Sequence, residues 1–155
     1  MAYTKIQVVF DAAEPDKLGE FWGLALGYVL QPLPPGFDTL EDFFASIGMP
    51  DWKWGDSYAL VDPADGGPRV YFQKVPEGKT AKNRVHLDVR VAGFDVRGAE
   101  RDSLRAQHVA RLVEAGGTVL RELDEAGGRC TVMQDPEGNE FCVALAPGDV
   151  ERVLG

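Results

Sequence analysis

The stretch QDPEGNEFCVAL, residues 134–145, decides the fold because it repeats an earlier stretch, VDPADGGPRVYFQKV, residues 61–75. In both, an Asp-Pro pair opens a glycine-containing turn, and a strand pattern with a phenylalanine, Phe72 or Phe141, follows. Proline fixes φ at the second position of such a turn and glycine tolerates positive φ later. DPEG, residues 135–138, therefore predicts a tight hairpin turn between two strands.

The elements before these turns repeat as well. KIQVVF, residues 5–10, alternates as a strand does, and a helix pattern follows from Pro15 to a stop at Gly27. RVHLDVRV, residues 84–91, alternates in the same way and precedes a helix predicted to end at Gly116. A half-sheet of this size cannot bury its own apolar face and needs a second copy of the unit to form a stable core. The sequence therefore predicts an α+β fold made of two βαβββ modules.

The two modules form a single predicted domain, residues 1–155. We place the first module at residues 4–76 and the second at residues 84–146. The remaining elements follow from alternation, helical spacing and glycine stops. They are the strands 28–31, 57–62, 69–75, 118–123, 129–134 and 140–145, and the helices 39–48 and 99–115.

One connection in the first module is unusually long. The segment 32–55 exceeds the common connection length of about 4–6 residues. Inside it, Thr39 with Asp42 three residues later resembles a capping box. Trp52 and Trp54 close the segment. We predict a lid-like insertion whose tryptophans either contact an apolar or aromatic ligand or pack their own loop down.

Composition argues against two classes of partner. The formal net charge of −9 would repel a phosphate backbone, so nucleic acid is not an expected partner. No apolar run approaches the roughly 20 residues that span a bilayer, and the opening MAYTKIQVVF lacks a signal-peptide core. The two cysteines, Cys130 and Cys142, do not make a disulfide framework. These features favour a cytoplasmic protein without a membrane partner.

The repeat and the DPEGN turn resemble the vicinal oxygen chelate superfamily, which includes glyoxalase I, extradiol dioxygenases, fosfomycin-resistance enzymes and bleomycin-binding proteins. RVHLDV and DPEGNEFCV resemble its glyoxalase-like, bleomycin-resistance-protein-like branch, and the resemblance covers residues 5–146. It implies two curled mixed sheets around a shared ligand cleft. The polar side chains of the strand 84–91, His86, Asp88 and Arg90, are then expected to face that cleft rather than water.

The resemblance also implies positions for a metal ion. In metal-dependent members each module supplies two ligands, and these positions fall here on Gln7, Gln73, His86 and Cys142. The superfamily pattern there is mainly His and Glu, whereas a neutral glutamine amide is a poor donor for Mg²⁺, Mn²⁺ or Fe²⁺. Zn²⁺ would accept His86 and a Cys142 thiolate, with Asp88 or Glu140 as a third ligand. We predict a cleft without a resident metal cofactor, and a divalent zinc, iron, manganese or nickel ion is the alternative.

Other residues are expected to contact a ligand or to carry protons. His86 and Glu140 could act as acid and base without a metal. Cys142 could be a nucleophile, although a half-buried cysteine is more often inert, and Cys130 is expected on the opposite side of its strand. The expected ligand-binding residues are Gln7, Gln73, His86, Asp88, Arg90, Met133, Cys142, Trp52 and Trp54.

Two functions of different classes follow. The first is a binding protein that holds a small organic molecule between its modules without chemistry, as the missing carboxylates favour. The second is an enzyme, either a metal-dependent lyase, isomerase or dioxygenase using His86 and Cys142, or a metal-free acid–base enzyme using His86 and Glu140. Strand edges and apolar content favour a homodimer.

Overall fold

The computed structural model describes residues 5–91, 98–125 and 128–145. Two predicted module ends, Thr4 and Ala146, lie outside these residues. The chain divides into two compact units, residues 1–78 (the N-terminal unit) and residues 79–155 (the C-terminal unit), and each is described by itself.

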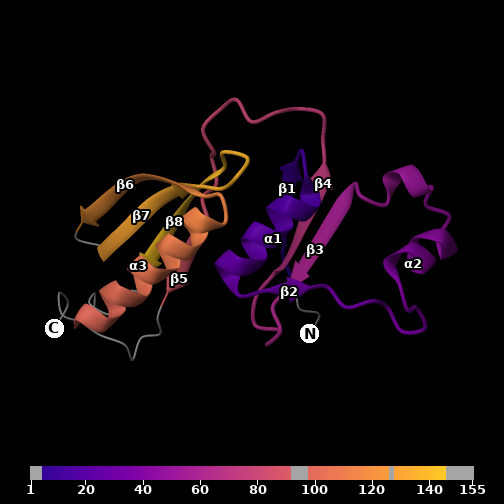
Figure 1. Ribbon diagram of the computed structural model, residues 1–155, viewed down its shortest axis with the longest axis horizontal. Helices are drawn as coiled ribbons and strands as arrows, with labels where there is room; N and C mark the ends of the chain where they lie inside the picture. The colour runs from indigo at the N-terminus through magenta and orange to yellow at the C-terminus, as the bar shows by residue number, and fades with distance from the viewer. Residues whose placement is uncertain (1–4, 92–97, 126–127, 146–155) are drawn as a thin grey trace. The chain divides into compact units, whose positions relative to one another are not determined.

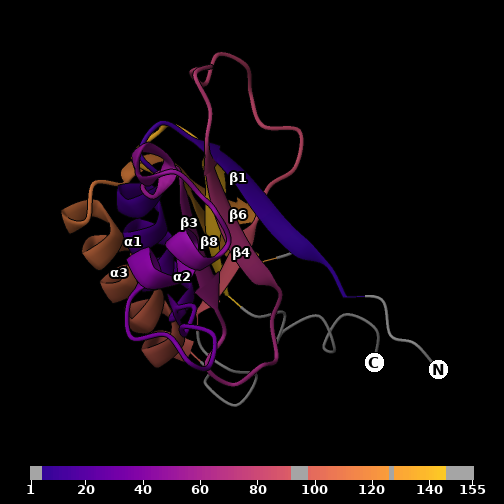
Figure 2. The ribbon, with the colours of Figure 1, turned by 90° about the vertical axis from the view of Figure 1, so that its right-hand side faces the viewer.

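The N-terminal unit begins with strand, helix and strand, and an insertion then leads to a hairpin (Figure 1). Its elements are β1 (Gln7–Ala12), α1 (Pro15–Leu26), β2 (Val29–Leu30), α2 (Leu40–Ser46), the 3₁₀ turn η1 (Asp51–Lys53), β3 (Ser57–Val61) and β4 (Arg69–Lys74). The strands form one mixed sheet in the order β1-β4-β3-β2, in which β1 and β4 are parallel and the other pairs antiparallel. Figure 2 shows β1 and β4 running along each other.

The C-terminal unit repeats this order without an insertion. Its elements are β5 (Asp88–Val91), α3 (Gly98–Glu114), β6 (Thr118–Glu125), β7 (Gly128–Gln134) and β8 (Glu140–Leu145). The sheet order β5-β8-β7-β6 is that of the first unit, and again only the outer pair of β5 and β8 is parallel. The predicted α+β class and the two repeated modules are confirmed.

The helix ends follow from local chemistry. Pro15 occupies the first turn of α1, where its missing N–H costs nothing, and Gly27 ends the helix in the left-handed conformation with φ of 69°. The apolar stripe of α1, including Phe21 and Trp22, is buried against its sheet, as the helical spacing predicts. The Thr39 hydroxyl accepts the N–H of Asp42 and so caps α2 as expected.

The two Asp-Pro turns are equivalent at the level of hydrogen bonds. Asp62 accepts the backbone N–H groups of Ala64 and Gly66, two and four residues later. Asp135 accepts those of Glu137 and Asn139, at the same two spacings. Each aspartate therefore holds its turn closed by satisfying two backbone donors.

The strand predicted at residues 84–91 is shorter than its alternation indicates. Only Asp88–Val91 pairs with β8, and the bond from the Cys142 N–H to the Leu87 carbonyl is its last ladder contact. Val85, which the alternation places on an apolar face, is 78% exposed. The prediction for residues 84–87 was wrong because alternation does not reveal whether a neighbouring strand is there to pair with.

None of the described helices is long and apolar enough to cross a membrane.

Candidate functional site

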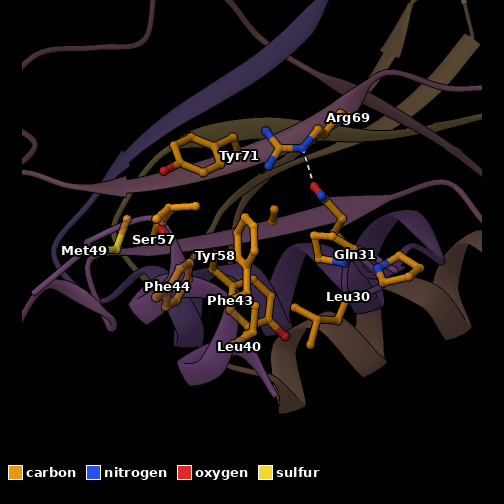
Figure 3. Close-up of a pocket in the computed structure, with 14 residues that line it drawn as sticks. Leu30, Gln31, Leu40, Phe43, Phe44, Met49, Ser57, Tyr58, Arg69 and Tyr71 are labelled. Carbon is orange, nitrogen blue, oxygen red and sulfur yellow. Dashed lines mark hydrogen bonds between the residues drawn. The ribbon is translucent and has the colours of Figure 1, made fainter. Parts of the chain in front are cut away.

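A pocket of about 250 Å³ lies in the N-terminal unit, between the insertion and strands β3 and β4 (Figure 3). Apolar and aromatic side chains dominate its wall, and a few polar groups interrupt them. It is lined by Leu30, Gln31, Pro32, Pro34, Leu40, Phe43, Phe44, Ile47, Met49, Ser57, Tyr58, Ala59, Arg69 and Tyr71. The volume lies a little below the range of about 300–1,000 Å³ usual for small-molecule sites.

The strands build one wall of the pocket through simple alternation. A Cβ on Gly19 of α1 would touch the ring of Tyr58, and Gly23 lies close to Leu60, so these two β3 residues face α1. Ser57 and Ala59 therefore face the other way, where Ala59 is opposite Tyr71 of β4. The face of this sheet opposite α1 thus supplies Ser57 and Ala59 to the pocket, and Tyr58, on the other face of β3, also lines it.

The insertion supplies the other side and is held together by aromatic contacts. The ring of Phe43 lies 5.3 Å from that of Phe37 and 5.8 Å from that of Phe44. Phe44 in turn lies 6.5 Å from the Trp54 ring, whose Nε1–H donates to the Met49 carbonyl at 3.1 Å. The segment is therefore a small folded cluster rather than a loose loop.

Neither predicted tryptophan lines this pocket. Trp54 packs the insertion against itself, which is one of the two roles that the sequence left open. Trp52 is 72% exposed, and the Lys53 ammonium lies 4.9 Å from its ring. Phe43 and Phe44 of α2 line this pocket instead.

Arg69 provides the polar end of the pocket. Its Nε donates to the Gln31 side-chain oxygen at 2.5 Å, and one terminal nitrogen donates to the Gln7 side-chain oxygen at 2.5 Å. Its guanidinium carbon lies 4.9 Å from the centre of the Tyr71 ring. Gln31 is itself fixed at the backbone, because its backbone N–H donates to the Ala59 carbonyl. A half-buried cation is thus held in place by two neutral amides and one aromatic face.

Gln7 and Gln73, the two predicted metal positions of the N-terminal unit, do not converge. Both lie on the face opposite α1, but Gln7 is opposite Arg69 and Gln73 is opposite Asp11, to which it donates at 2.8 Å. Four residues separate the two sites along the strands, or roughly 13 Å. These side chains do not form a pair of ligands for one ion.

The strand register also corrects the predicted equivalence between the modules. Gln73 is opposite Asp11, and the equivalent Cys142 is opposite Asp88. Asp11 and Asp88 are therefore the matching residues of the two first strands, and Gln7 does not match His86. His86 lies outside β5 and is exposed, and its Nε2 is 3.2 Å from the Asn83 carbonyl oxygen.

Asp88 and Arg90 share one face of β5, and both are exposed in the described structure. Thr131 of β7 bonds to Arg105 of α3, which places Thr131 and the alternate residue Met133 on the face toward the helix. Met133 is fully buried opposite Phe141, so the expectation that it contacts a ligand was wrong: it is a core residue.

The prediction that Cys130 faces the opposite side of the sheet from Cys142 was also wrong. It lies opposite Ala144, and Cys142 lies opposite Val132, so both cysteines face away from α3 on neighbouring strands. Burial, the neighbouring Cys130 thiol and the Asp88 carboxylate together raise the pKa of Cys142 to about 11. The Cys142 thiol is therefore protonated at neutral pH and is a poor nucleophile.

Glu140 is fastened to the segment that precedes β5. Its carboxylate accepts the Asn83 N–H at 3.0 Å and pairs with the Lys79 ammonium at 3.0 Å. These two contacts hold the pKa of Glu140 at about 2, well below its ordinary value. A carboxylate with so low a pKa is a weak base at neutral pH, so this geometry gives little support to the predicted acid–base role with His86.

Neither unit, taken by itself, offers a good metal site among its described residues. Within residues 5–91, 98–125 and 128–145, no three His, Cys, Asp or Glu side chains are grouped so that they could hold an ion. The four positions predicted from the resemblance hold two separated glutamines, an exposed histidine and a cysteine with a raised pKa. This donor set does not fit the divalent cation that the resemblance implies.

The sequence matches the family model of the glyoxalase-like domain over residues 7–144. The chain belongs to this family. The glyoxalase-like assignment confirms the predicted place in the vicinal oxygen chelate superfamily. Among curated proteins, none matches the sequence.

Solved structures share the glyoxalase-like fold with this chain. The fosfomycin resistance protein FosX from Mesorhizobium loti aligns over 100% of both chains, with 12% identity and a TM-score of 0.60. A glyoxalase-related enzyme from Fulvimarina pelagi covers 94% of this chain and 90% of its own, with 17% identity and a TM-score of 0.57. A glyoxalase/bleomycin resistance protein/dioxygenase family enzyme from Burkholderia phytofirmans PsJN covers 91% of this chain and 95% of its own, with 14% identity and a TM-score of 0.54. Identities this low establish the fold and not the reaction.

The residues that build this pocket were not among the predicted ligand-binding residues. Arg69, Tyr71 and Gln73 alternate along RVYFQK, which was enough to place them together on one strand face. Phe43 and Phe44 lie within the predicted helix 39–48, and nothing in the helix pattern indicates a pocket. The missing information was the position of the insertion against that face, which no local pattern encodes.

Proposed function

We propose that this glyoxalase-like protein binds a small organic molecule with an apolar or aromatic body, in the pocket between the insertion and strands β3 and β4. One observation carries the proposal: a concave site whose wall is mainly apolar and aromatic, with Arg69 and Gln31 placed at one end. This combination of a broad apolar surface with a few fixed polar groups is typical of small-molecule sites.

The wall groups suit a flat ligand. Phe43 and Phe44 approach from the insertion and Tyr71 from the sheet, so an aromatic body would meet rings from both sides. Contact between aromatic rings adds about 0.5–1.5 kcal/mol per pair beyond area burial. Binding without chemistry agrees with the poor metal donor set and the weak base at Glu140. A homodimer and a cytoplasmic location stay predictions.

The proposal is tested by titrating the protein with 2-naphthamide, a neutral aromatic probe, and following backbone amide signals by NMR. We expect saturable shifts at Phe43, Phe44, Ser57 and Tyr71, with a Kd in the micromolar to millimolar range. Ala59→Leu would fill the pocket from the strand side and weaken binding about tenfold or more. Saturable binding that Ala59→Leu leaves intact, or no shifts up to about 5 mM probe, would overturn the proposal.

Ala45→Leu is the matched control. Ala45 lies on α2 but is exposed and does not line the pocket. The same substitution there is expected to leave probe binding unchanged, which separates blocking of the pocket from a general effect of added bulk.

A further inference from the structure

We infer that Arg69 recognises an anionic group, a carboxylate in the first instance, so that the ligand of the pocket is an aromatic or apolar carboxylate. This inference rests on the proposed function and adds the chemical class of the ligand. It depends on three features of Arg69: its unused donors, its uncompensated charge and its place in the pocket wall.

Arg69 is fixed in position but retains hydrogen-bonding capacity. A guanidinium carries five N–H donors, and two of them are used in the bonds to Gln31 and Gln7. Five less two leaves three donors, located on the two terminal nitrogens, for another acceptor. The planar fork of a guanidinium matches the two oxygens of a carboxylate, and such a pair is shorter and stronger than a neutral hydrogen bond.

The charge of Arg69 is not neutralised by its bonding partners. Both oxygens that it bonds belong to neutral amides, and its third contact is the Tyr71 ring. Among the residues that the structure describes, no carboxylate forms an ion pair with it. In a protein with a net charge of −9, a half-buried arginine held only by neutral groups is available for an anion that is not part of the chain.

The rest of the pocket does not oppose an anion. Arg69 is the one charged residue in the described lining, because the other wall residues are apolar, aromatic or neutral polar. The acidic residues of α2, Glu41 and Asp42, are exposed and do not line it, and Asp42 is engaged by the Thr39 hydroxyl. The lining of this pocket is therefore positive, whereas a second hollow that Arg69 also lines includes Lys5, Asp62 and Asp65.

The fixed position of Arg69 at one end of an apolar wall defines the shape of the ligand. Figure 3 shows the guanidinium beside Gln31, with the rings of Phe43 and Phe44 away from it, toward the insertion. A molecule that bonds Arg69 with its acidic group would therefore place its apolar body against these rings. Inorganic anions would satisfy Arg69 but leave the apolar wall unused.

The test compares two probes of the same shape, 2-naphthoate and 2-naphthamide, by isothermal titration calorimetry at low salt. The probes differ in charge and share the aromatic body. We expect the wild-type protein to bind 2-naphthoate about tenfold or more tightly than 2-naphthamide, as charge-assisted bonds to a guanidinium predict. Arg69→Met keeps an apolar side chain and is expected to weaken the binding of 2-naphthoate much more than that of 2-naphthamide, so that the preference is lost.

Lys74→Met is the matched control for the change in net charge. Lys74 lies on the same strand, β4, but is exposed, pairs with Asp56 and does not line the pocket. It is expected to keep the preference for 2-naphthoate. A circular dichroism spectrum and a melting temperature close to those of the wild type show that Arg69→Met is folded.

The outcomes separate the two proposals. If the wild type binds both probes equally well, or if Arg69→Met weakens both equally, the inference about the anion fails while the binding function stands. If neither probe binds the wild-type protein, the proposed function fails first, and the inference fails with it. A preference that Lys74→Met also abolishes would assign the effect to net charge and overturn the role of Arg69.

Discussion

The two units share one topology and differ in one connection. In the N-terminal unit 26 residues, 31–56, separate β2 from β3, whereas in the C-terminal unit two residues, 126–127, separate β6 from β7. β2 has two residues and β6 has eight. The long connection therefore goes with a shortened edge strand, and the aromatic insertion forms a pocket with residues of β3 and β4. The repeat sets the sheet, and the insertion makes the pocket.

Equivalent positions also take different roles in the two units. With Phe72 matched to Phe141, Tyr71 of the pocket wall corresponds to Glu140, which instead fastens the segment before β5. The helices are attached differently as well. Gly19 allows α1 to approach Tyr58 closely, whereas Arg105 of α3 bonds to Thr131 and Glu122 in a polar network.

The largest expected effect tests whether the shared positions are energetically equivalent. Phe72 and Phe141 are 0% and 1% exposed, so Phe72→Ala and Phe141→Ala should each lower the free energy of unfolding by about 3–5 kcal/mol. Urea unfolding followed by circular dichroism measures both. A loss below about 1 kcal/mol for one variant but not for the other would mean that the two cores are not built alike.

A smaller effect is expected from the helix contact that is particular to the N-terminal unit. In Gly19→Ala the new Cβ would lie 2.2 Å from a ring carbon of Tyr58, so the ring must move, at a cost of about 1–3 kcal/mol. Gly23→Ala on the same helix is the control, because its Cβ would meet nothing nearer than 3.4 Å. Alanine has the higher helix propensity, so the control should be neutral or slightly stabilising. Equal thermal stability of the two variants would contradict the close contact.

The smallest effect concerns the contacts of Glu140 with Asn83 and Lys79 in the C-terminal unit, and it depends on pH. The pKa of Glu140 is depressed in the folded state to about 2, so its contribution to stability is present above the ordinary pKa of a glutamate and is lost as pH falls toward 2. Glu140→Gln should lower the melting temperature at pH 7, and the difference from wild type should shrink as the pH falls from 5 to 2. A difference that is the same at pH 7 and at pH 2 would show that the charge of Glu140 does not stabilise this unit.

Much of the fold could be predicted because its signals are local. The stop at Gly27, the cap at Thr39 and the turn at Asp135 each depend on a few neighbouring residues, and the structure confirms them. Their repetition along the chain then predicted two modules of the same kind.

The face of β7 could not be predicted, because alternation fails there. Thr131, Val132 and Met133 are all buried, so three consecutive residues give no indication of which side faces the helix. Cys130 and Met133 were assigned to the wrong faces for this reason. Likewise, Arg69 at the start of a strand has the appearance of a solvated charge in the sequence, and only the position of Gln31, 38 residues earlier, shows its role.

The long connection between β2 and β3 has a consequence for how such a chain can change over evolutionary time. The entropy of closing a loop grows only with the logarithm of its length, so extending a connection from two residues to 26 costs about 2 kcal/mol. That amount is within the stability margin of an ordinary domain. The lining of the pocket can therefore diversify through insertions and replacements at this one junction, while both sheets keep their registers and both Asp-Pro turns keep their bonds.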